Sequence, residues 1–571
     1  MKKILIINKT SITVYTIIMI LLSILTFEIG YCNTEWLRNT FADITQTQYN
    51  FSLCRIVIYI VFILLYIIFK NVFIKEALEV ASKKYKRVLI YITIGLVVCS
   101  IAMSFIFCSI DLNLLRAVSI GLITAFLGSL FVIYISNNII KNLIVIYATL
   151  GIIFTFTTSY NHAIDEKRHF MSAVNLSFLN FDYENNPITD KNIEKLPQLS
   201  KFTTIDNFFG KYEQDVTDKV HLEDAPSLPA PYNFLTYTFP AIGIALARFL
   251  HGSIIDMYIL GRIMNLILYT LLICIALKIM PYKKNIFFVL AMMPYMLLLA
   301  ASYSIDGYCI GIIYIFIAYC LKIKKEKDTI SLKNLAIIVA LFILVLLAKS
   351  MAYILVGCIV LMLPLINTIK KNKKYIPLIV ICTIVLTIAA IFLVMYVKDT
   401  KLVEDSRASG EISSSKQLEL LLTNPIHDIK LLIEHTKNSL LNFDWYSMLH
   451  YEIFFTKDAK CVMLPLMIFI LYVSLTETDY IFKIRDKIFM ITVFLMVWAM
   501  TSLALYLSFT QVGALSVAGY QTRYIVPILP LVLFGIANNK VLSDKKENRT
   551  MNIAIISAIF IGIGIAQLII V

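Results

Sequence analysis

The sequence predicts an all-α polytopic membrane protein. Hydrophobic residues make up 59% of the 571-residue chain, charged residues only 15%, and the mean hydropathy is +0.81. A soluble domain carries about 25% charged residues. Because ~20 consecutive apolar residues cross the hydrocarbon core of a bilayer and many runs here approach or reach that length, we expect about 14–15 transmembrane helices.

The positions of the basic residues predict the topology. The net charge is +14, and the lysines and arginines gather in short runs between apolar segments, as in Lys322–Lys327 and Lys370–Lys374. Such runs stay on the cytoplasmic side of bacterial membranes. We therefore attribute the charge to topology and expect no nucleic-acid partner. The ten cysteines occur singly, which is typical of small buried side chains and not of disulfides or a zinc site.

Placing successive loops on alternate sides of the membrane gives an ordered set of transmembrane spans. The first span is expected to be retained as a membrane anchor. The spans lie at about residues 11–30, 51–69, 88–108, 114–135, 139–158, 254–277, 285–301, 307–321, 332–347, 353–366, 376–397, 462–475, 488–508, 524–536 and 553–570.

Five parts follow from this order. Residues 1–158 hold four extra spans and the span that precedes an acidic loop, and residues 159–253 form an extracytoplasmic loop with a juxtamembrane helix at Asn233–Phe249. That segment is short and contains Pro240, which favours an interfacial helix over an ordinary span; the ordinary span is the alternative. Residues 254–397 form the transmembrane core, 398–460 an extracytoplasmic amphipathic segment, and 461–571 the C-terminal spans. Asn424 and Pro425 predict that the amphipathic segment consists of two helices.

An acidic pair, Asp165 and Glu166, stands where the fifth span ends, and His169 follows it. Carboxylates at a membrane face can remove protons, bind cations or cap a helix. A divalent cation held by these three residues stays open as an alternative, and we assign no metal site and no cofactor.

The expected topology brings further ionisable residues to the same level, namely Arg262, Asp306, Lys349 and Arg523. Ionisable groups beside a bilayer tend to be paired or functional. A carboxylate that deprotonates a hydroxyl, together with cations that stabilise a departing phosphate, would suit group transfer from a lipid phosphate. The structural alternatives are that Lys349 reaches to the interface, Asp306 caps a helix, and Arg523 is only an ion-pair partner.

Several short motifs, taken in order, resemble a family of bacterial membrane proteins grouped as domain of unknown function 2142, which in turn resembles the GT-C superfamily of lipid-linked-sugar glycosyltransferases. The likeness covers about residues 154–536, although Ile164 and Lys167 stand where the family often has proline, and Ser350 and Met351 replace a double proline. The matching residues are Asp165, Glu166, His169 and Phe170; Pro231 and Tyr232; Gly261, Arg262 and Asn265; Ala301, Ser302, Ser304 and Asp306; Ala348, Lys349 and Tyr353; Gln417, Asn424 and Pro425; and Gly519, Gln521, Arg523 and Tyr524.

The resemblance implies a GT-C-like helical bundle in the bacterial plasma membrane, with its site facing outside. It implies an inverting transferase that moves a sugar from a polyprenyl phosphate to a cell-envelope glycan acceptor. Asp165 is the expected base, and Glu166 is the alternative base or an orienting group. A flippase or transporter of a lipid-linked glycan is the competing hypothesis. The expected substrate-binding residues are His169, Arg262, Asp306, Lys349, Tyr353, Gln521, Arg523 and Tyr524.

Overall fold

A computed structural model describes most of the chain after residue 134. The described residues are 135–158, 163–190, 219–221, 230–250, 254–326, 329–349, 353–371, 412–441, 460–537 and 549–570, apart from 164, 184, 185, 231, 478 and 481. The expected spans at residues 11–30, 51–69, 88–108, 114–135 and 376–397 fall outside or almost entirely outside this part of the chain.

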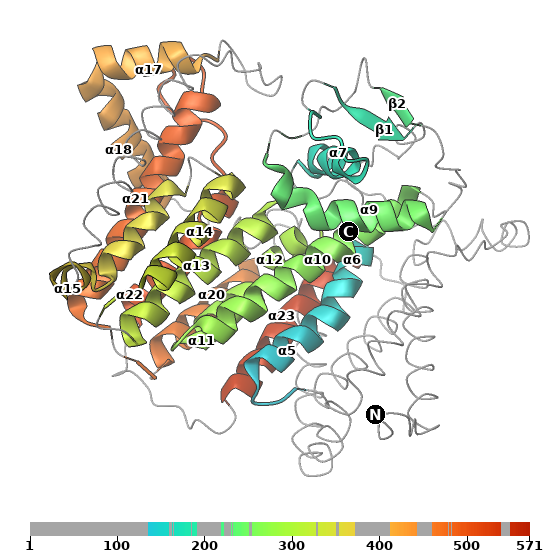
Figure 1. Ribbon diagram of the computed structural model, residues 1–571, viewed down its shortest axis with the longest axis horizontal. Helices are drawn as coiled ribbons and strands as arrows, with labels where there is room; N and C mark the ends of the chain where they lie inside the picture. The colour runs from blue at the N-terminus through green and yellow to red at the C-terminus, as the bar shows by residue number, and fades with distance from the viewer. Residues whose placement is uncertain are drawn as a thin grey trace, which may run out of the picture.

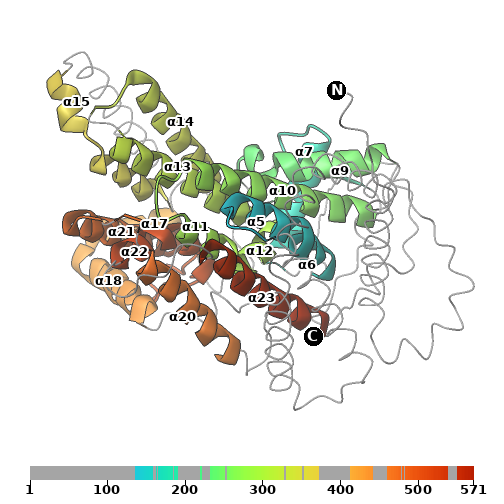
Figure 2. The same cartoon turned by 90° about the horizontal axis from the view of Figure 1, so that it is seen from below.

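The described part is a bundle of apolar helices, which confirms an all-α polytopic membrane protein. Helices α10 (Ile254–Ile279), α13 (Asp306–Glu326) and α14 (Leu332–Lys349) lie side by side, α10 against α13 and α13 against α14 (Figure 1). Across the bundle lie α20 (Lys460–Thr476), α21 (Ile484–Ser508), α22 (Leu529–Ile536) and α23 (Arg549–Ile570) (Figure 2). Of the described helices, α10, α13, α14 and α21 are long and apolar enough to cross a membrane.

Exposed apolar side chains recur on these helices at helical spacing. On α10 they are Ile267, Leu271 and Ile275, four residues apart, and on α14 they are Val339 and Ile343. In water such stripes would be costly, whereas in a bilayer they face lipid tails that are equally apolar. The stripes therefore mark the lipid-facing sides of the bundle.

The centre of the bundle is filled by two short helices in place of one expected span at residues 285–301. These are α11 (Lys284–Ala291) and α12 (Pro294–Ala300), and every side chain of α12 is buried. The break falls at Met292 and Met293 because proline takes the first position of α12 and cannot continue the preceding helix. The α11 segment contacts α20, α22 and α23, so the two halves of the bundle meet on it.

Other expected spans also differ in detail. Residues 139–158 form α5 (Ile139–Ile146), the π-helical turn η1 (Tyr147–Gly151) and α6 (Ile152–Thr157). The span expected at 353–366 is a 3₁₀ helix, η4 (Ile354–Met362), followed by α15 (Leu365–Lys371). The span expected at 524–536 begins with two 3₁₀ turns, η6 (Thr522–Tyr524) and η7 (Val526–Ile528), and ends with α22. Pro364 and Pro527 stand at these changes, since proline removes a helical N–H donor.

A small unit covers the end of the bundle at which α10 and α13 begin. Helix α9 (Thr238–Phe249), preceded by the 3₁₀ turn η3 (Phe234–Tyr237), lies across α10, and α7 (Glu166–Ser177) packs on α9 (Figure 1). The strands β1 (Ile188–Asp190) and β2 (Lys219–His221) pair antiparallel above α7. Asn175 ties the strand to the helix, because its Oδ1 accepts from the Ile188 amide at 2.6 Å. A helical segment is thus present where one was expected at Asn233–Phe249, and its juxtamembrane position stays a prediction.

Residues 412–441, the described part of the amphipathic segment, contain two helices that meet where expected. Helix α17 (Ser414–Thr423) ends at Asn424, and α18 (Pro425–Leu441) begins at the proline. Leu431 and its neighbours pack against Tyr506, Leu507 and Val517 at the end of α21. Ile426, Ile429 and Ile433 remain exposed. That this exposed stripe rests on a lipid leaflet stays a prediction.

The opposite end of the bundle is closed by a separate polar cluster. Glu477 pairs with Arg549 at 3.1 Å and accepts from the Asn285 side chain at 3.0 and 3.1 Å. Lys283 donates from Nζ to the Glu477 carbonyl. These bonds join the loop after α10 to the loop after α20 and to the start of α23, so they hold the two halves of the bundle together.

Candidate functional site

Asp165 lies at the start of α7 in the left-handed region, with φ of 61°. Only a few per cent of non-glycine residues adopt positive φ, and Asp is among those that tolerate it best. The turn separates the two neighbouring carboxylates: Glu166 enters the helix and is fully buried, whereas the Asp165 side chain keeps 23% of its surface exposed. Asp165 Oδ2 accepts from Arg523 Nη2 at 3.1 Å.

Arg523 is the second member of a chain of alternating charges. Its Nη1 lies 3.5 Å from Asp306 Oδ2, and Asp306 Oδ1 lies 2.6 Å from Lys349 Nζ. We call Asp165, Arg523, Asp306 and Lys349 the charge chain. Its two carboxylates and two cations balance, which offsets much of the cost of removing charges from water. Residues up to 358 positions apart in the sequence therefore meet at one site.

Asp306 is fixed by the turn that precedes α13. Ser304 Oγ donates to Asp306 Oδ2 at 3.1 Å and accepts from the Asp306 amide at 3.2 Å. Asn265 on α10 holds the same turn, because its Nδ2 donates to the carbonyls of Ser302 and Ser304 at 2.6 and 3.1 Å. The motif residues on α10 and before α13 thus bind each other and place one carboxylate.

Arg523 depends on the backbone just before it. Gly519 has φ of 73°, and a Cβ there would lie 2.3 Å from the Phe509 ring. Glycine is the residue that adopts this conformation without strain and leaves room for the ring. This tight backbone position comes four residues before Arg523, whose side chain reaches Asp165.

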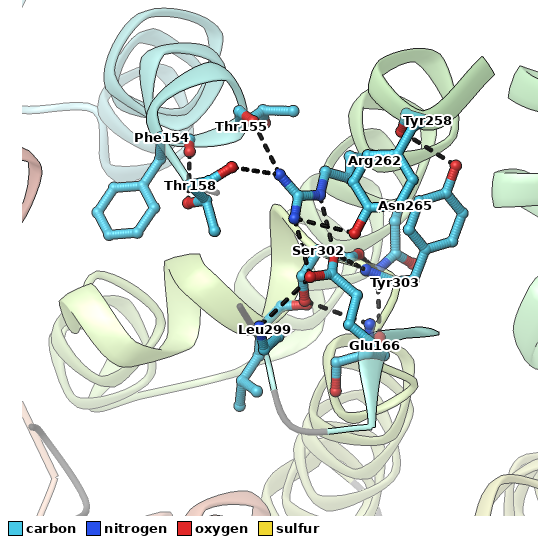
Figure 3. Close-up of polar contacts among 12 residues, drawn as sticks. Phe154, Thr155, Thr158, Glu166, Tyr258, Arg262, Asn265, Leu299, Ser302 and Tyr303 are labelled. Carbon is cyan, nitrogen blue, oxygen red and sulfur yellow. Dashed lines mark hydrogen bonds and ion pairs between the residues drawn. The ribbon is translucent and has the colours of Figure 1, made fainter. Parts of the chain in front are cut away.

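Glu166 and Arg262 form a separate, sealed ion pair (Figure 3). Both side chains are 0% exposed, and Arg262 Nε and Nη2 each lie 2.8 Å from a Glu166 oxygen. The Ala163 and Tyr303 amides also donate to Glu166, at 3.3 and 3.2 Å. These four groups are all N–H donors to the carboxylate oxygens, and hydrogen bonds to charged groups are among the stronger ones in proteins.

The remaining Arg262 donors are also occupied. Nη1 donates to the carbonyls of Thr155 and Thr158, and Nη2 to the Tyr258 hydroxyl. The guanidinium thus binds the end of α6 as well as the start of α7 (Figure 3). This arrangement assigns the pair a positioning role: it anchors the turn that carries Asp165. No sequence pattern predicted the two threonine carbonyls as partners, although Tyr258, four residues before Arg262, lies on the same face of α10.

Gly261 leaves room for the Tyr303 side chain next to the Glu166–Arg262 ion pair. A Cβ at Gly261 would lie 1.9 Å from the Tyr303 hydroxyl, which donates to the carbonyls of Met257 and Tyr258 at 3.1 and 3.0 Å. The close approach brings the Tyr303 amide to Glu166. The glycine is thus needed next to the arginine for packing and not for ligand contact.

His169 lies one turn further along α7. Its Nδ1 is 2.8 Å from the Tyr237 hydroxyl, and its ring centroid is 5.6 Å from that of Tyr232. Burial, followed by the positive charge of Arg523, lowers the pKa of His169 to about 3. The imidazole is therefore neutral at ordinary pH, where it can donate or accept a hydrogen bond but carries no charge.

One tyrosine ring borders the cations, and a second tyrosine binds the backbone of the first. The Tyr353 hydroxyl donates to the Tyr524 carbonyl at 2.9 Å. Lys349 Nζ lies 4.7 Å from the centroid of the Tyr524 ring, and Arg523 Cζ lies 5.5 Å from it. Such cation–π contacts stabilise the two positive charges at one ring. The structure thus brings together Asp165, Asp306, Lys349, Tyr353, Arg523 and Tyr524, with His169 close by.

Gln521 differs from this set, because no contact of its side chain with the charge chain is found among the described residues, and its buried Oε1 has no hydrogen-bond partner among them. Nor does the described part of the chain contain three or more His, Cys, Asp or Glu side chains grouped as a metal site. The three residues that we considered as cation ligands bind different partners. Asp165 accepts from Arg523, Glu166 accepts from Arg262, and His169 shares a hydrogen bond with Tyr237.

The arrangement can perform acid–base chemistry on a bound hydroxyl. Asp165 is a partly exposed carboxylate that pairs with Arg523, and Asp306 links that arginine to a second cation, Lys349. A cation-flanked carboxylate at the end of a membrane bundle suits a proton-accepting step next to an anionic lipid head group.

Comparison with known proteins gives one match. The family model described as "Predicted membrane protein (DUF2142)" matches residues 149–532. No curated protein and no solved structure matches the chain. The matched region contains α7, the charge chain and the sealed ion pair. The chain therefore belongs to the family of predicted membrane proteins with domain of unknown function 2142.

Proposed function

We propose that the protein is an inverting glycosyltransferase of the GT-C type. It would transfer a sugar from a polyprenyl phosphate to a glycan acceptor of the cell envelope. The single observation that carries this proposal is the separation of the two carboxylates: Glu166 is sealed against Arg262, while Asp165 stays partly exposed and joins a chain with two cations.

In this reaction the acceptor hydroxyl attacks the anomeric carbon of the donor, and Asp165 takes the hydroxyl proton. The bond between that carbon and the phosphate oxygen breaks, and polyprenyl phosphate leaves. Arg523 and Lys349 stabilise the leaving phosphate. Because both cations are paired with Asp306, a ligand phosphate must share them with that carboxylate.

The other site residues have supporting roles. Asp306 fixes the spacing of the two cations, and the Tyr524 ring borders both. Neutral His169 orients the substrate through hydrogen bonding. Arg262, which we expected to bind phosphate, has partners for its guanidinium in the described structure, so its proposed part is to hold the turn before α7.

The same proposal places the site on the outer face of a bacterial plasma membrane. Helix α13 begins at Asp306 and ends next to Lys324 and Lys325, and its 21 residues span about 31 Å at 1.5 Å per residue. The basic end would face the cytoplasm under the positive-inside rule, which leaves the charge chain outside.

The test is transfer by purified protein in detergent, with a panel of polyprenyl-phosphate sugars and envelope glycans and with products measured by mass. Asp165→Asn keeps the volume and removes the proton acceptor, so turnover should fall by about 10²–10⁴-fold. Asp182→Asn, an exposed carboxylate beyond α7, is the matched control.

Full turnover by Asp165→Asn would exclude this residue as the base. If the wild-type protein transfers no sugar from any donor while liposomes containing it move a lipid-linked glycan, the transport hypothesis replaces the enzyme.

A further inference from the structure

The end of the bundle opposite the charge chain carries an exposed basic surface. Its cations are Lys325 in the last turn of α13, and Lys483 and Arg485 at the start of α21. None of the three forms an ion pair with a described residue. Exposed cations are common on proteins and by themselves indicate no ligand. What these three can bind depends on how they are placed.

An ion pair between the two helices brings the basic segments together. Lys324 Nζ lies 2.6 Å from Asp486 Oδ1. Because Lys325 follows that lysine and Arg485 precedes that aspartate, both exposed cations stand where α13 meets α21. The same pair neutralises Asp486, the acidic residue in the first turn of α21. The junction therefore holds its own carboxylate engaged while the outer cations stay available.

An aromatic cluster connects the third cation to the other two. Lys325 Nζ lies 5.5 Å from the centroid of the Tyr282 ring. Tyr282 stacks on Tyr480 with centroids 4.1 Å apart and meets the ring of Phe482 edge-on at 5.2 Å. Phe482 is buried and directly precedes Lys483. The cluster thus fixes the backbone from which Lys325 and Lys483 extend.

The remaining carboxylates near this junction also have partners. Glu477 pairs with Arg549, and Asp479 accepts from the Lys283 amide at 2.7 Å. In the segments that meet here, residues 281–285, 322–326 and 477–487, basic residues outnumber acidic ones. The surface therefore has an excess of positive charge and attracts an anion.

Exposed apolar side chains continue this surface along α21. Ile484, between the two cations of α21, keeps 72% of its surface exposed, and Ile488 one turn later keeps 59%. Leu495 is exposed on the same side two turns further on. As on α10 and α14, such a stripe faces lipid tails. Lys483 and Arg485 therefore stand at the level of the lipid head groups, beside the first lipid-facing residue of the helix.

We infer that Lys325, Lys483 and Arg485 form a binding site for the head group of an anionic phospholipid. The lipid phosphate lies among the three cations, and the acyl chains lie along Ile484 and Ile488. A soluble anion would use only the cations, whereas the adjoining apolar stripe is matched by a lipid. The site lies at the far end of α13 from the charge chain, so the inference is independent of the proposed function.

Binding at this site should stabilise the folded protein. The site is built from α13 and α21, which belong to the two halves of the bundle, so a bound lipid joins them. A ligand that binds only the folded state raises the melting temperature as its concentration increases. In a neutral detergent, phosphatidylglycerol should therefore raise the melting temperature in a saturable manner, and zwitterionic phosphatidylcholine should not.

The test is this titration with the wild-type protein and with variants of the two cations on α21. Lys483→Gln with Arg485→Gln removes side chains that have no described partner, so its melting temperature without lipid should equal that of the wild type. Each cation near a membrane surface is worth about a fivefold change in affinity. The double variant should therefore bind phosphatidylglycerol about 30-fold more weakly, and Arg485→Gln alone about fivefold more weakly.

The matched control removes the same charge from the same end of the bundle. Lys370→Gln with Lys371→Gln changes two exposed cations of α15, a helix that Thr368 ties to the loop after α13. This variant should bind phosphatidylglycerol as the wild type does. Equal weakening by both double variants would show diffuse attraction and overturn the site.

Two further outcomes would also overturn it. One is an equal response to phosphatidylglycerol and phosphatidylcholine, or no saturable response to either. The other is an equal shift with glycerol 3-phosphate, which has the anionic group without acyl chains and would assign the surface to a soluble anion.

Discussion

Replacing the two neighbouring carboxylates by amides should affect different properties of the protein. Glu166→Gln should lower stability, because the four groups within 3.3 Å of the Glu166 oxygens are all N–H donors: Arg262 Nε and Nη2 and the amides of Ala163 and Tyr303. The amide of glutamine would direct its own N–H groups at some of these donors. It would also leave Arg262 as a fully buried cation without a counter-charge.

Breaking a buried ion pair by removing one partner costs about 3–5 kcal/mol. With an unfolding entropy of about 2.1 cal/mol/K per residue, a chain of this length that unfolds cooperatively would melt about 3–4 °C lower. Asp165→Asn should shift the melting temperature by less, because this side chain is partly exposed and Arg523 keeps Asp306. The matched control is Glu419→Gln, an exposed carboxylate on α17.

The measurement is a thermal scan of each variant in the same detergent, with turnover measured on the same preparations. A double variant, Glu166→Gln with Arg262→Met, should lose less stability than the two single losses added, because the charges then disappear together. A Glu166→Gln variant that melts with the wild type would refute the anchoring role. Equal losses of turnover at positions 165 and 166, with unchanged melting, would show that the two carboxylates act together as acid and base.

Four further predictions follow from the same geometry. Gly519→Ala should lower the melting temperature and turnover together, since the backbone has positive φ and the added Cβ meets Phe509; wild-type values for both would contradict the placement of Arg523 by this turn. Arg523→Ala should raise the donor KM more than Arg523→Lys, because lysine keeps a cation; equal effects would argue against phosphate binding. The folded pKa of His169, about 3, lies below its unfolded value of about 6.5, so protonation of the unfolded state costs stability as pH falls from 6.5 towards 3. His169→Gln should therefore flatten the fall in melting temperature over that range, and an unchanged slope would point to other groups. Cysteines placed in Lys322–Lys327 should resist a membrane-impermeant reagent in intact cells while cysteines in the loop after residue 158 react, and labelling of the basic run would overturn the topology.

The sequence predicted well which segments are helical and predicted less well where a helix is interrupted. Long apolar runs predicted α10, α13, α14 and α21, although the span expected at 307–321 ends five residues before α13 does, because hydrophobic length indicates whether a helix can span a bilayer. Pro294 and Pro364 were visible, yet nothing local showed whether neighbouring helices would satisfy the freed backbone groups. The observed breaks at α12 and after η4 depend on that tertiary packing.

In the candidate site, too, the sequence did not show which partners each side chain would meet. Topology brought Arg262 and Arg523 to one level, and Arg262 was a further candidate beside Arg523 for binding a phosphate. Only the fold distinguishes them, since Arg262 meets two carbonyls at the end of α6 and a carboxylate of α7, whereas Arg523 reaches the partly exposed Asp165. A single left-handed residue, Asp165, produces this difference, and its conformation could not be predicted from its neighbours.

The two ion pairs also explain why the acidic residues are adjacent. A carboxylate that must stay ionised and accessible beside cations needs a rigid backbone, and its own ion pair with Arg523 cannot supply rigidity if a ligand competes for that arginine. Glu166 supplies it from the next position, because its partners lie on α10 and in the turns before α7 and α13, away from the exposed side chain. Glu166 thereby contributes to stability and its neighbour Asp165 to reactivity. The role of Glu166 can be tested by the melting temperature and that of Asp165 by turnover.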